Sequence, residues 1–589
     1  MRKINFEVDK KLITPSDFAL KATRVPIDIP DRDLRSWFES YSTMSAPIKV
    51  IKVVRTYDTL AINRLEKQKE EIINRYKKNK GHIQQVLLQL ELTRLQGEVN
   101  KKLASKEFKY TSAVYITFAK SSMPKHLLQT LKSQQKTSCL RRLFSGSRRS
   151  YDMKGNKINL RKAPEPTDVL WKNLGYTNKE KRRSRVITNL STLLILSGGF
   201  ALIMLINWAE RRFKTDVGES VIAAKELSMA GSVLIAIINA ILSIVVRELT
   251  EVEKHGTKSG YATAYASKTA IALLVNTAFI SLIANIALSE SFTLTYDVLN
   301  TLYKLNIYGS DGLLQNIFYV FITNTFFLPI YNLFDPEYFL RLYIQRQFLK
   351  LGDTAVVTQK TANSLFEGPL PNMSNKYAQL IKTMLLTSFY APGMPMATLF
   401  SLLGVALTYW SDKYIFLRRN ALPPALNHHL NTAMLDYLDL FGFTFAVGNI
   451  MFTASLLQSD GSLSYKQDMN NKNVMYLTLG LSLLNILLPM KAINRKIWKP
   501  KREIDQENEN YDEARKTFST DYDLENPITR HQVYNDPTNQ HSKGSKSGAK
   551  GSDKNVQARL GDSILSNVLT KMGFGLGKGG RDPKDKGKK

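Results

Sequence analysis

Polar side chains recur inside two long apolar stretches of the chain, Thr269–Leu288 and Leu313–Phe334. At membrane depth, an unsatisfied polar group costs free energy unless it faces protein or water. Such residues therefore either line a water-filled path or join neighbouring helices by hydrogen bonds. One set of candidates follows, beginning at the inner edge of the first stretch: Lys268, Asn276, Thr277, Ser281, Asn285, Asn316, Thr323, Asn324 and Thr325.

Residue patterns for covalent or metal chemistry are absent from the sequence. It contains no P-loop, nucleophile elbow, zinc-ligand spacing or pair of carboxylates within the apolar stretches. Cys139 is the single cysteine, so no intramolecular disulfide can form. His428 and His429 are adjacent and point to different faces of a helix, which does not suit a shared metal ion. We therefore expect no enzyme activity, no cofactor and no bound metal.

Eight apolar windows are candidates for membrane-spanning helices, because a bilayer core about 30 Å thick needs roughly 20 apolar residues per helix. Pro392 and Pro395 leave two alternatives for the fifth and sixth windows, one kinked hairpin or two full spans. The sequence predicts a polytopic α-helical protein of the plasma membrane or an internal membrane. The windows are Val186–Asn207, Gly231–Val246, Thr269–Leu288, Leu313–Phe334, Tyr377–Tyr390, Met394–Trp410, Leu438–Leu457 and Val474–Met490.

Positive charge indicates the orientation of these windows. The net charge of +31 suits nucleic acid or an anionic membrane surface equally well, so the position of the charges must decide. A basic cluster directly before the first window places the N-terminal region in the cytosol, and alternation then places the C-terminus there too. The "AERRFK" segment after the first window is the exception, because alternation places its basic residues on the side away from the cytosol. Residues expected to meet lipid headgroups are Trp171, Lys181, Arg182, Arg183 and Arg185.

The polar regions on either side of the windows have different characters. Residues 1–160 read as strand, helix, strand, a helical insertion at about 58–105, then strand and helix, which predicts an α+β module like an RNA-recognition motif, split by a helical hairpin. Tyr115, Ile116 and Phe118 fit only the end of the RNA-binding signature, so nucleic acid is not expected as a partner. Residues 161–185 form a linker into the membrane domain, 186–492. The tail, 493–589, is predicted to be cytosolic and largely disordered.

Several blocks together resemble one family. The "PSDF" segment, "APEPTDVLWKNLG", "ELTEVEKHGTKSGYATAYASKTAIALLVNTAFI" and "FYAPGMPMATLFSLLGVALTYWSDKYIFLRRN" are similar to the OSCA/CSC-type calcium-permeable stress-gated cation channels, within the anoctamin and transmembrane-channel-like superfamily. The resemblance covers roughly residues 13–499. It implies a channel gated by mechanical or osmotic stress, with lipids and permeating Ca, K and Na ions as partners, and it leaves a homodimer open.

The resemblance also implies roles for particular residues. The two polar stretches correspond to the pore-lining pair of helices, with Phe318, Phe321, Ile322 and Pro329 as candidates for a gate or hinge. The chain departs from the family in two ways. Family members carry about three further helices before the cytosolic module, and this sequence does not show them. Their pore helix is typically rich in glycine and contains an acid, whereas Leu313–Phe334 contains neither glycine nor acid. A phospholipid scramblase of the same superfamily is one alternative to a channel, since a polar groove open to lipid can be built from the same helices, and a non-conducting truncated paralogue is another.

Overall fold

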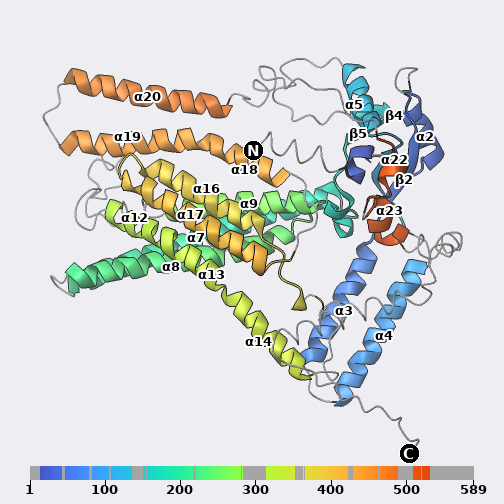
Figure 1. Cartoon of the computed structure of the whole chain (residues 1–589), viewed down its shortest axis with the longest axis horizontal. Coiled ribbons are helices and arrows are strands. Elements are labelled where there is room, and N and C mark those ends of the chain that lie inside the picture. Colours follow the sequence, from blue (N-terminus) through green and yellow to red (C-terminus); the bar gives the residue numbers. More distant parts are fainter. Residues whose placement is uncertain are drawn as a thin grey trace, which may run out of the picture. The chain divides into compact units, whose positions relative to one another are not determined.

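The computed structural model describes residues 13–42, 47–78, 82–104, 108–134, 150–153, 155–216, 221–279, 282, 313–351, 363, 365–421, 429–459, 465–487, 509–518 and 520–530. The chain divides into a unit from Met1 to Ile528 and a second unit from Thr529 to Lys589. The helices and strands named below belong to the first unit, which combines a sheet module with a set of long helices (Figure 1).

The sheet contains five strands in the order β2-β3-β1-β5-β4, and all the neighbouring pairs are antiparallel. β4 and β5 form a hairpin that the sequence analysis did not predict. Its turn contains Gly155 at φ +83°, a left-handed conformation that glycine adopts without a Cβ clash. The strands are β1 (Ala19–Thr23), β2 (Val50–Tyr57), β3 (Tyr110–Phe118), β4 (Ser150–Met153) and β5 (Asn156–Lys162).

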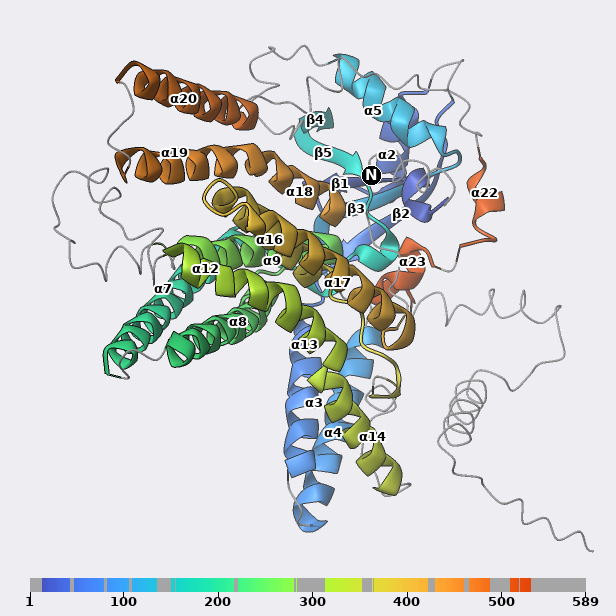
Figure 2. The same ribbon diagram turned by 60° about the vertical axis from the view of Figure 1, so that its left-hand side comes forward.

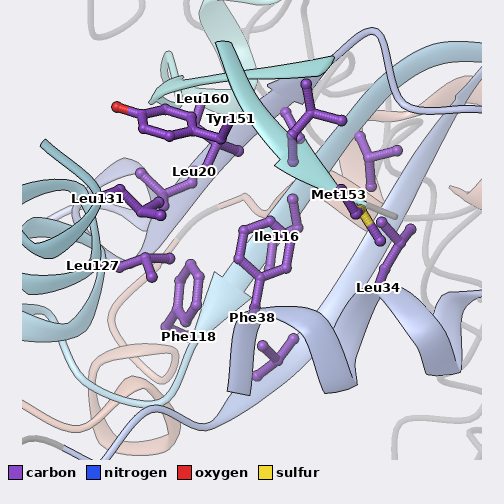
Figure 3. Close-up of a cluster of buried hydrophobic side chains, with 14 of the residues drawn as sticks. Leu20, Leu34, Phe38, Ile116, Phe118, Leu127, Leu131, Tyr151, Met153 and Leu160 are labelled. Atoms are coloured by element: carbon purple, nitrogen blue, oxygen red, sulfur yellow. The ribbon is translucent and has the colours of Figure 1, made fainter. Parts of the chain in front are cut away.

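One face of the sheet packs against α2 (Asp31–Glu39) and α5 (Ser122–Gln134) around a shared apolar core (Figure 3). Leu34 and Phe38 lie four residues apart on α2, so they share one face of that helix, and both are fully buried. Ile116 of β3 is also buried in this core. Complete burial of one such side chain stabilises the fold by about 1.5–3 kcal/mol, so this layer fixes the sheet and both helices together.

A pair of long helices, α3 (Leu60–Lys78) and α4 (His82–Ala104), occupies the region predicted as a helical insertion. They pack along each other and lie side by side in both views (Figure 1, Figure 2). Residues 79–81, which include Gly81 and separate the two helices in sequence, lie outside the described residues. The insertion leaves the sheet intact because it joins β2 and β3, which are neighbouring antiparallel strands.

Helices dominate the chain after the sheet. α9 packs against α16 and α18, α8 packs against α7 and α9, and α17 packs against α13. The described elements are α7 (Asn178–Asp216), α8 (Val221–Glu251), α9 (Lys258–Leu274), η4 (Val275–Phe279), α12 (Leu313–Ile322), η5 (Thr323–Phe327), α13 (Leu328–Phe334), α14 (Pro336–Leu351), α16 (Met373–Tyr390), α17 (Met396–Arg418), α18 (His429–Tyr437), η7 (Leu438–Leu440), α19 (Phe441–Ser459) and α20 (Tyr465–Leu487).

Four helical stretches in the described part of the chain are long and apolar enough to cross a membrane. The predicted windows fall largely on helix wherever their residues are described, but the count of eight spans stays a prediction. The fifth and sixth windows are separate helices, α16 and α17, joined by a turn at residues 391–395. The four stretches are Asn178–Leu205, Met229–Glu251, Leu313–Lys350 and His429–Phe452.

A segment of the C-terminal tail, residues 509–528, packs on the sheet. It contains the short helices α22 (Tyr511–Ala514) and α23 (Tyr522–Glu525), and Tyr511 and Tyr522 are fully buried. Tyr511 N donates to Ala119 O at 2.8 Å, next to the end of β3. Within the tail that was predicted to be largely disordered, this segment is ordered because its aromatic side chains cover an apolar face of the sheet.

Candidate functional site

Two π-helical segments coincide with predicted polar residues of the apolar stretches. η4 continues α9, and η5 lies between α12 and α13. π-Helical turns are rare and occur frequently at functional sites, because they displace the side chains that follow from the regular helical faces. The two segments hold five of the predicted residues: Asn276, Thr277, Thr323, Asn324 and Thr325.

The polar side chains of η4 hydrogen-bond to α8. Asn276 Nδ2 donates to Asn239 Oδ1 at 2.5 Å, and Asn239 Nδ2 donates to Thr277 Oγ1 at 3.1 Å. All three residues are buried. Asn276 Oδ1 has no hydrogen-bond partner among the described residues. It faces α7 at Gly199, where an added Cβ would lie 3.6 Å away. One acceptor therefore remains unsatisfied where three helices meet.

The hydroxyls of η5 contact two other helices. Thr323 Oγ1 and Ser232 Oγ of α8 are 2.7 Å apart. Thr325 Oγ1 donates to the carbonyl oxygen of Phe400 on α17 at 2.9 Å. This contact needs a close approach of α17, which Gly404 permits, since a Cβ there would lie 3.1 Å from Thr325 Cα. η5 is thus held between α8 and α17.

A buried lysine completes this arrangement. Lys382 of α16 is 2% exposed, and its Nζ donates to Asn324 Oδ1 at 2.9 Å. No carboxylate among the described residues pairs with it. The predicted window Tyr377–Tyr390 would place this lysine at membrane depth, where an ionisable side chain is costly in free energy and points to a functional site. The sequence analysis missed Lys382, although a lysine inside the window Tyr377–Tyr390 was the signal that could have found it.

These residues form a cluster that we call the polar centre: Ser232, Asn239, Asn276, Thr277, Thr323, Asn324 and Lys382. In this conformation its hydrogen bonds join α8, η4, η5 and α16 to one another. That is the second of the two roles considered for polar residues at membrane depth. The assignment of Asn276, Thr277, Thr323 and Asn324 to a pore lining stays a prediction, and it requires these helices to separate.

Other predicted pore and gate residues lie around the polar centre. Asn316 Oδ1 on α12 is buried and has no partner among the described residues. Phe318 packs edge-on against Phe400, with ring centroids 5.5 Å apart, and Phe321 is buried in the core around Tyr390. Ile322, the last residue of α12, is partly buried. Ser281 and Asn285 lie outside the described residues.

Pro329 is buried and opens α13 directly after η5. A proline has no backbone N–H, so it removes one hydrogen bond from the helical ladder. A π-helical segment lies directly before it, and prolines and π-helical turns are both causes of bends in helices. The structure thus places an irregular helical segment at the predicted hinge, while hinge motion itself stays a prediction.

The linker into the membrane helices is anchored to the loop between α8 and α9. Ser259 donates its backbone N to Asp168 Oδ1 at 2.7 Å and its Oγ to Asp168 Oδ2 at 2.5 Å. Leu170 N donates to Gly256 O at 3.0 Å, and Asn173 Nδ2 donates to His255 O at 2.8 Å. We call this contact the linker joint. It connects the sheet module to the first turn of α9, the helix that leads into η4.

A buried carboxylate lies beside the linker joint. Glu253 accepts from Thr188 Oγ1 at 2.6 Å and from His255 Nε2 at 3.0 Å, and it pairs with Lys268. Burial alone would raise the pKa of Glu253, but the hydrogen bonds from His255, Lys268 and Thr188 outweigh it and lower that pKa to about 2. Lys268, predicted to line a pore, therefore serves this ion pair.

The "PSDF" and "APEP" blocks of the sequence meet in space. Glu165 accepts from Thr14 Oγ1 at 2.6 Å and from Ser16 Oγ at 2.5 Å, and Lys162 pairs with Asp17 at 2.8 Å. Burial raises the pKa of Glu165, and the two hydroxyl donors partly offset this effect. The extended linker is thus fixed to the start of β1 at one end and to α9 at the other.

The predicted headgroup residues fall into two groups. Arg182, Arg183 and Arg185 of α7 are exposed, and Lys181 is partly buried. Trp171 instead packs on the sheet against Tyr115, with ring centroids 5.5 Å apart, and its Nε1 is buried without a partner in the described part of the chain. Its place at headgroup depth stays a prediction.

Residues 17–173 match the family model described as "Cytosolic domain of 10TM putative phosphate transporter". No curated protein matches the chain. The matched region ends at Asn173, within the linker joint. The chain therefore combines a domain similar to the cytosolic part of a multi-pass transporter family with helices long and apolar enough to span a membrane.

Proposed function

We propose that the chain is a multi-pass membrane ion channel, opened by mechanical or osmotic stress, that passes Ca, K and Na ions. The proposal includes eight membrane spans, a cytosolic module like an RNA-recognition motif, and a cytosolic C-terminus. The strand order β2-β3-β1-β5, with α2 and α5 on one face, supports the module, since split β-α-β units have this arrangement. Packing of residues 509–528 on the same module supports the C-terminal orientation.

The polar centre is the observation that carries this proposal. Amides and hydroxyls converge at two π-helical segments of helices that are otherwise apolar. Membrane tension favours the conformation with the larger cross-sectional area, just as a ligand favours the state it binds better. Separation of α8 from η4 and η5 would break the Asn239–Asn276 and Ser232–Thr323 hydrogen bonds and release oxygen atoms to water and cations.

The linker joint supplies the connection to the cytosolic module. Asp168 holds Ser259 in the first turn of α9, and η4 lies on the same continuous helix. A displacement of the module therefore acts on the helix that carries Asn276. No step in this mechanism makes or breaks a covalent bond, so the chain is proposed to be a transport protein without enzyme activity.

Patch-clamp recording of the full chain in liposomes under stepped suction tests this proposal. We expect stretch-evoked currents whose unitary conductance changes in Asn276→Ala and in Asn324→Ala. Asn473→Ala is the matched control, because this residue is exposed on α20 and should leave the conductance unchanged. The absence of stretch-evoked current from correctly inserted protein would overturn the proposal that the chain is a channel. A fluorescent-lipid assay on the same liposomes would then separate a scramblase from a non-conducting protein.

A further inference from the structure

A cavity of about 680 Å³ lies among α7, α9, α18 and the loop between α8 and α9. It adjoins the linker joint, because His255 belongs to both. It is also lined by charged groups whose roles the polar centre does not explain. The lining residues that matter here are Arg185, Glu253, Thr263, Lys268, His429 and Asp436.

We propose that this cavity binds a ligand carrying a single phosphate group. Arg185 is exposed on α7, and no described carboxylate pairs with it. Its guanidinium has five N–H donors in a planar fork that matches two phosphate oxygens. It lies at the cytosolic start of the membrane helices, where anionic groups are available from lipid and from solution.

The α9 wall of the cavity offers further donors. Lys268 has three N–H donors, and the pair with Glu253 uses one of them. Thr263 Oγ1 is a buried atom without a hydrogen-bond partner among the described residues. A buried hydroxyl normally finds a partner, so its vacancy on the wall of a cavity points to a ligand or an ordered water. Different oxygen atoms of one phosphate group would accept from Lys268 and from Thr263.

The fixed charges of the cavity limit the size of the ligand's charge. Arg185 and Lys268 are balanced by Glu253 and Asp436, and the two lining histidines are the remaining titratable groups. Glu253 already accepts hydrogen bonds from three donors, so its negative charge is compensated by these neighbours. Asp436 places a second carboxylate on the lining, from the α18 side, and a carboxylate repels a polyanion more strongly than a single phosphate. The cavity therefore suits one phosphomonoester or phosphodiester rather than a polyphosphate.

The source of the phosphate is either a lipid headgroup or a soluble phosphoester, and two arms of one experiment distinguish them. In the first arm, the full chain in phosphatidylcholine nanodiscs is titrated with glycerol 3-phosphate by calorimetry. In the second, the full chain in nanodiscs containing phosphatidic acid is extracted, and the retained lipid is counted by native mass spectrometry. Binding in the first arm identifies a soluble ligand, and binding in the second alone identifies a lipid.

The variants separate the cavity from general attraction by the basic cluster. Arg185→Gln should weaken binding by about tenfold, the effect of losing one charged hydrogen-bonding group. Thr263→Val should weaken it by a smaller factor and keeps all charges. Arg183→Gln is the matched control, because it removes the same charge from the same helix but does not line the cavity. Melting temperatures in phosphatidylcholine nanodiscs confirm that each variant is folded.

Two results would overturn the proposal. Equal losses in Arg183→Gln and Arg185→Gln would mean that only the surface charge of α7 attracts the anion. Absence of binding in both arms, with folded protein, would mean that the cavity is a void without a ligand. Neither binding measurement requires a current, so the proposed site and the proposed channel activity are tested independently.

Discussion

Tyr522 stacks on Tyr115, with ring centroids 4.8 Å apart and ring planes inclined by 17°. Tyr115 lies on the face of the sheet opposite α2 and α5, which is the face on which RNA-recognition modules stack bases. Tyr522 Oη also donates to the carbonyl oxygen of Pro164 at 2.6 Å, so the C-terminal segment touches both the sheet and the linker. The aromatic surface of the module is thus occupied by a segment of its own chain.

Removing the ring of Tyr522 should weaken the packing of the C-terminal segment on the sheet. Tyr522→Ala loses a fully buried aromatic side chain, a change that costs about 3–5 kcal/mol in folded cores. Tyr522→Phe keeps the ring and loses only the hydrogen bond to Pro164, about 1 kcal/mol. Hydrogen exchange of residues 110–118 and 509–528 should be much faster in the alanine variant than in the phenylalanine variant. Equal protection in both would contradict the docking.

Lys52 provides an electrostatic attachment of the same segment. Its Nζ lies 2.9 Å from Asp521 and 2.7 Å from Asp523, while Tyr511 donates to Asp521. Burial would raise the pKa of Asp521, but the charge of Lys52 and these hydrogen bonds lower it below its ordinary value. The attachment is therefore retained at neutral pH and does not depend on the ring stack alone.

Glu253 should make the stability of the membrane helices depend on pH. Its folded-state pKa of about 2 lies below the ordinary value of 4.5, so ionised Glu253 stabilises the fold above about pH 4.5. That contribution is lost as the pH falls towards 2. Glu253→Gln removes it at every pH, and we expect the variant to melt below the wild type at pH 7 but to approach it at pH 3. A difference in melting temperature that stays constant between pH 7 and pH 3 would refute this role.

Local patterns predicted many of the elements correctly. The strand, helix and strand predicted at the start of residues 1–160 became β1, α2 and β2, and the helical pattern around residues 58–105 became α3 and α4, because neighbouring residues dominate such preferences. Asn276 and Asn324 were singled out because amides are rare in apolar windows. Their hydrogen bonds to Asn239 and Lys382 depend on helix packing, which a linear pattern does not encode.

Long-range contacts explain what the sequence did not predict. Residues 161–185 were predicted to be a linker, yet the hydrogen bonds between Ser259 and Asp168 bring together residues from distant parts of the chain. Tyr522 lies in a polar tail with few apolar neighbours in sequence, so composition suggested disorder. Its partner Tyr115 is visible only once the sheet is formed.

Lys382 and Lys376 both lie on α16, and removal of their charges should have different effects on the stability of the fold. Lys382→Met replaces a buried ammonium that lacks a described counterion, and we expect the melting temperature to hold or rise. Lys376 pairs with Asp412 at 2.6 Å, so Lys376→Met leaves a carboxylate unpaired and should cost about 1–3 kcal/mol. Thermal unfolding of both variants in one detergent is the measurement. A loss of stability in Lys382→Met as large as that in Lys376→Met would show that the contacts of Lys382 fully offset the cost of burying its charge.

Two glycines of α19 provide a matched test of how the helices pack. A Cβ on Gly448 would lie 2.0 Å from the backbone oxygen of Phe389 on α16, and a main-chain atom cannot rotate away. Gly448→Ala must therefore push α19 from α16 and should cost about 1–3 kcal/mol or more. Gly442→Ala meets nothing within 4 Å on the same helix, so it should be neutral or stabilise by up to about 1 kcal/mol. Melting temperatures of the two variants measure the difference. Equal stability of the two would mean that α16 and α19 do not approach this closely in the membrane.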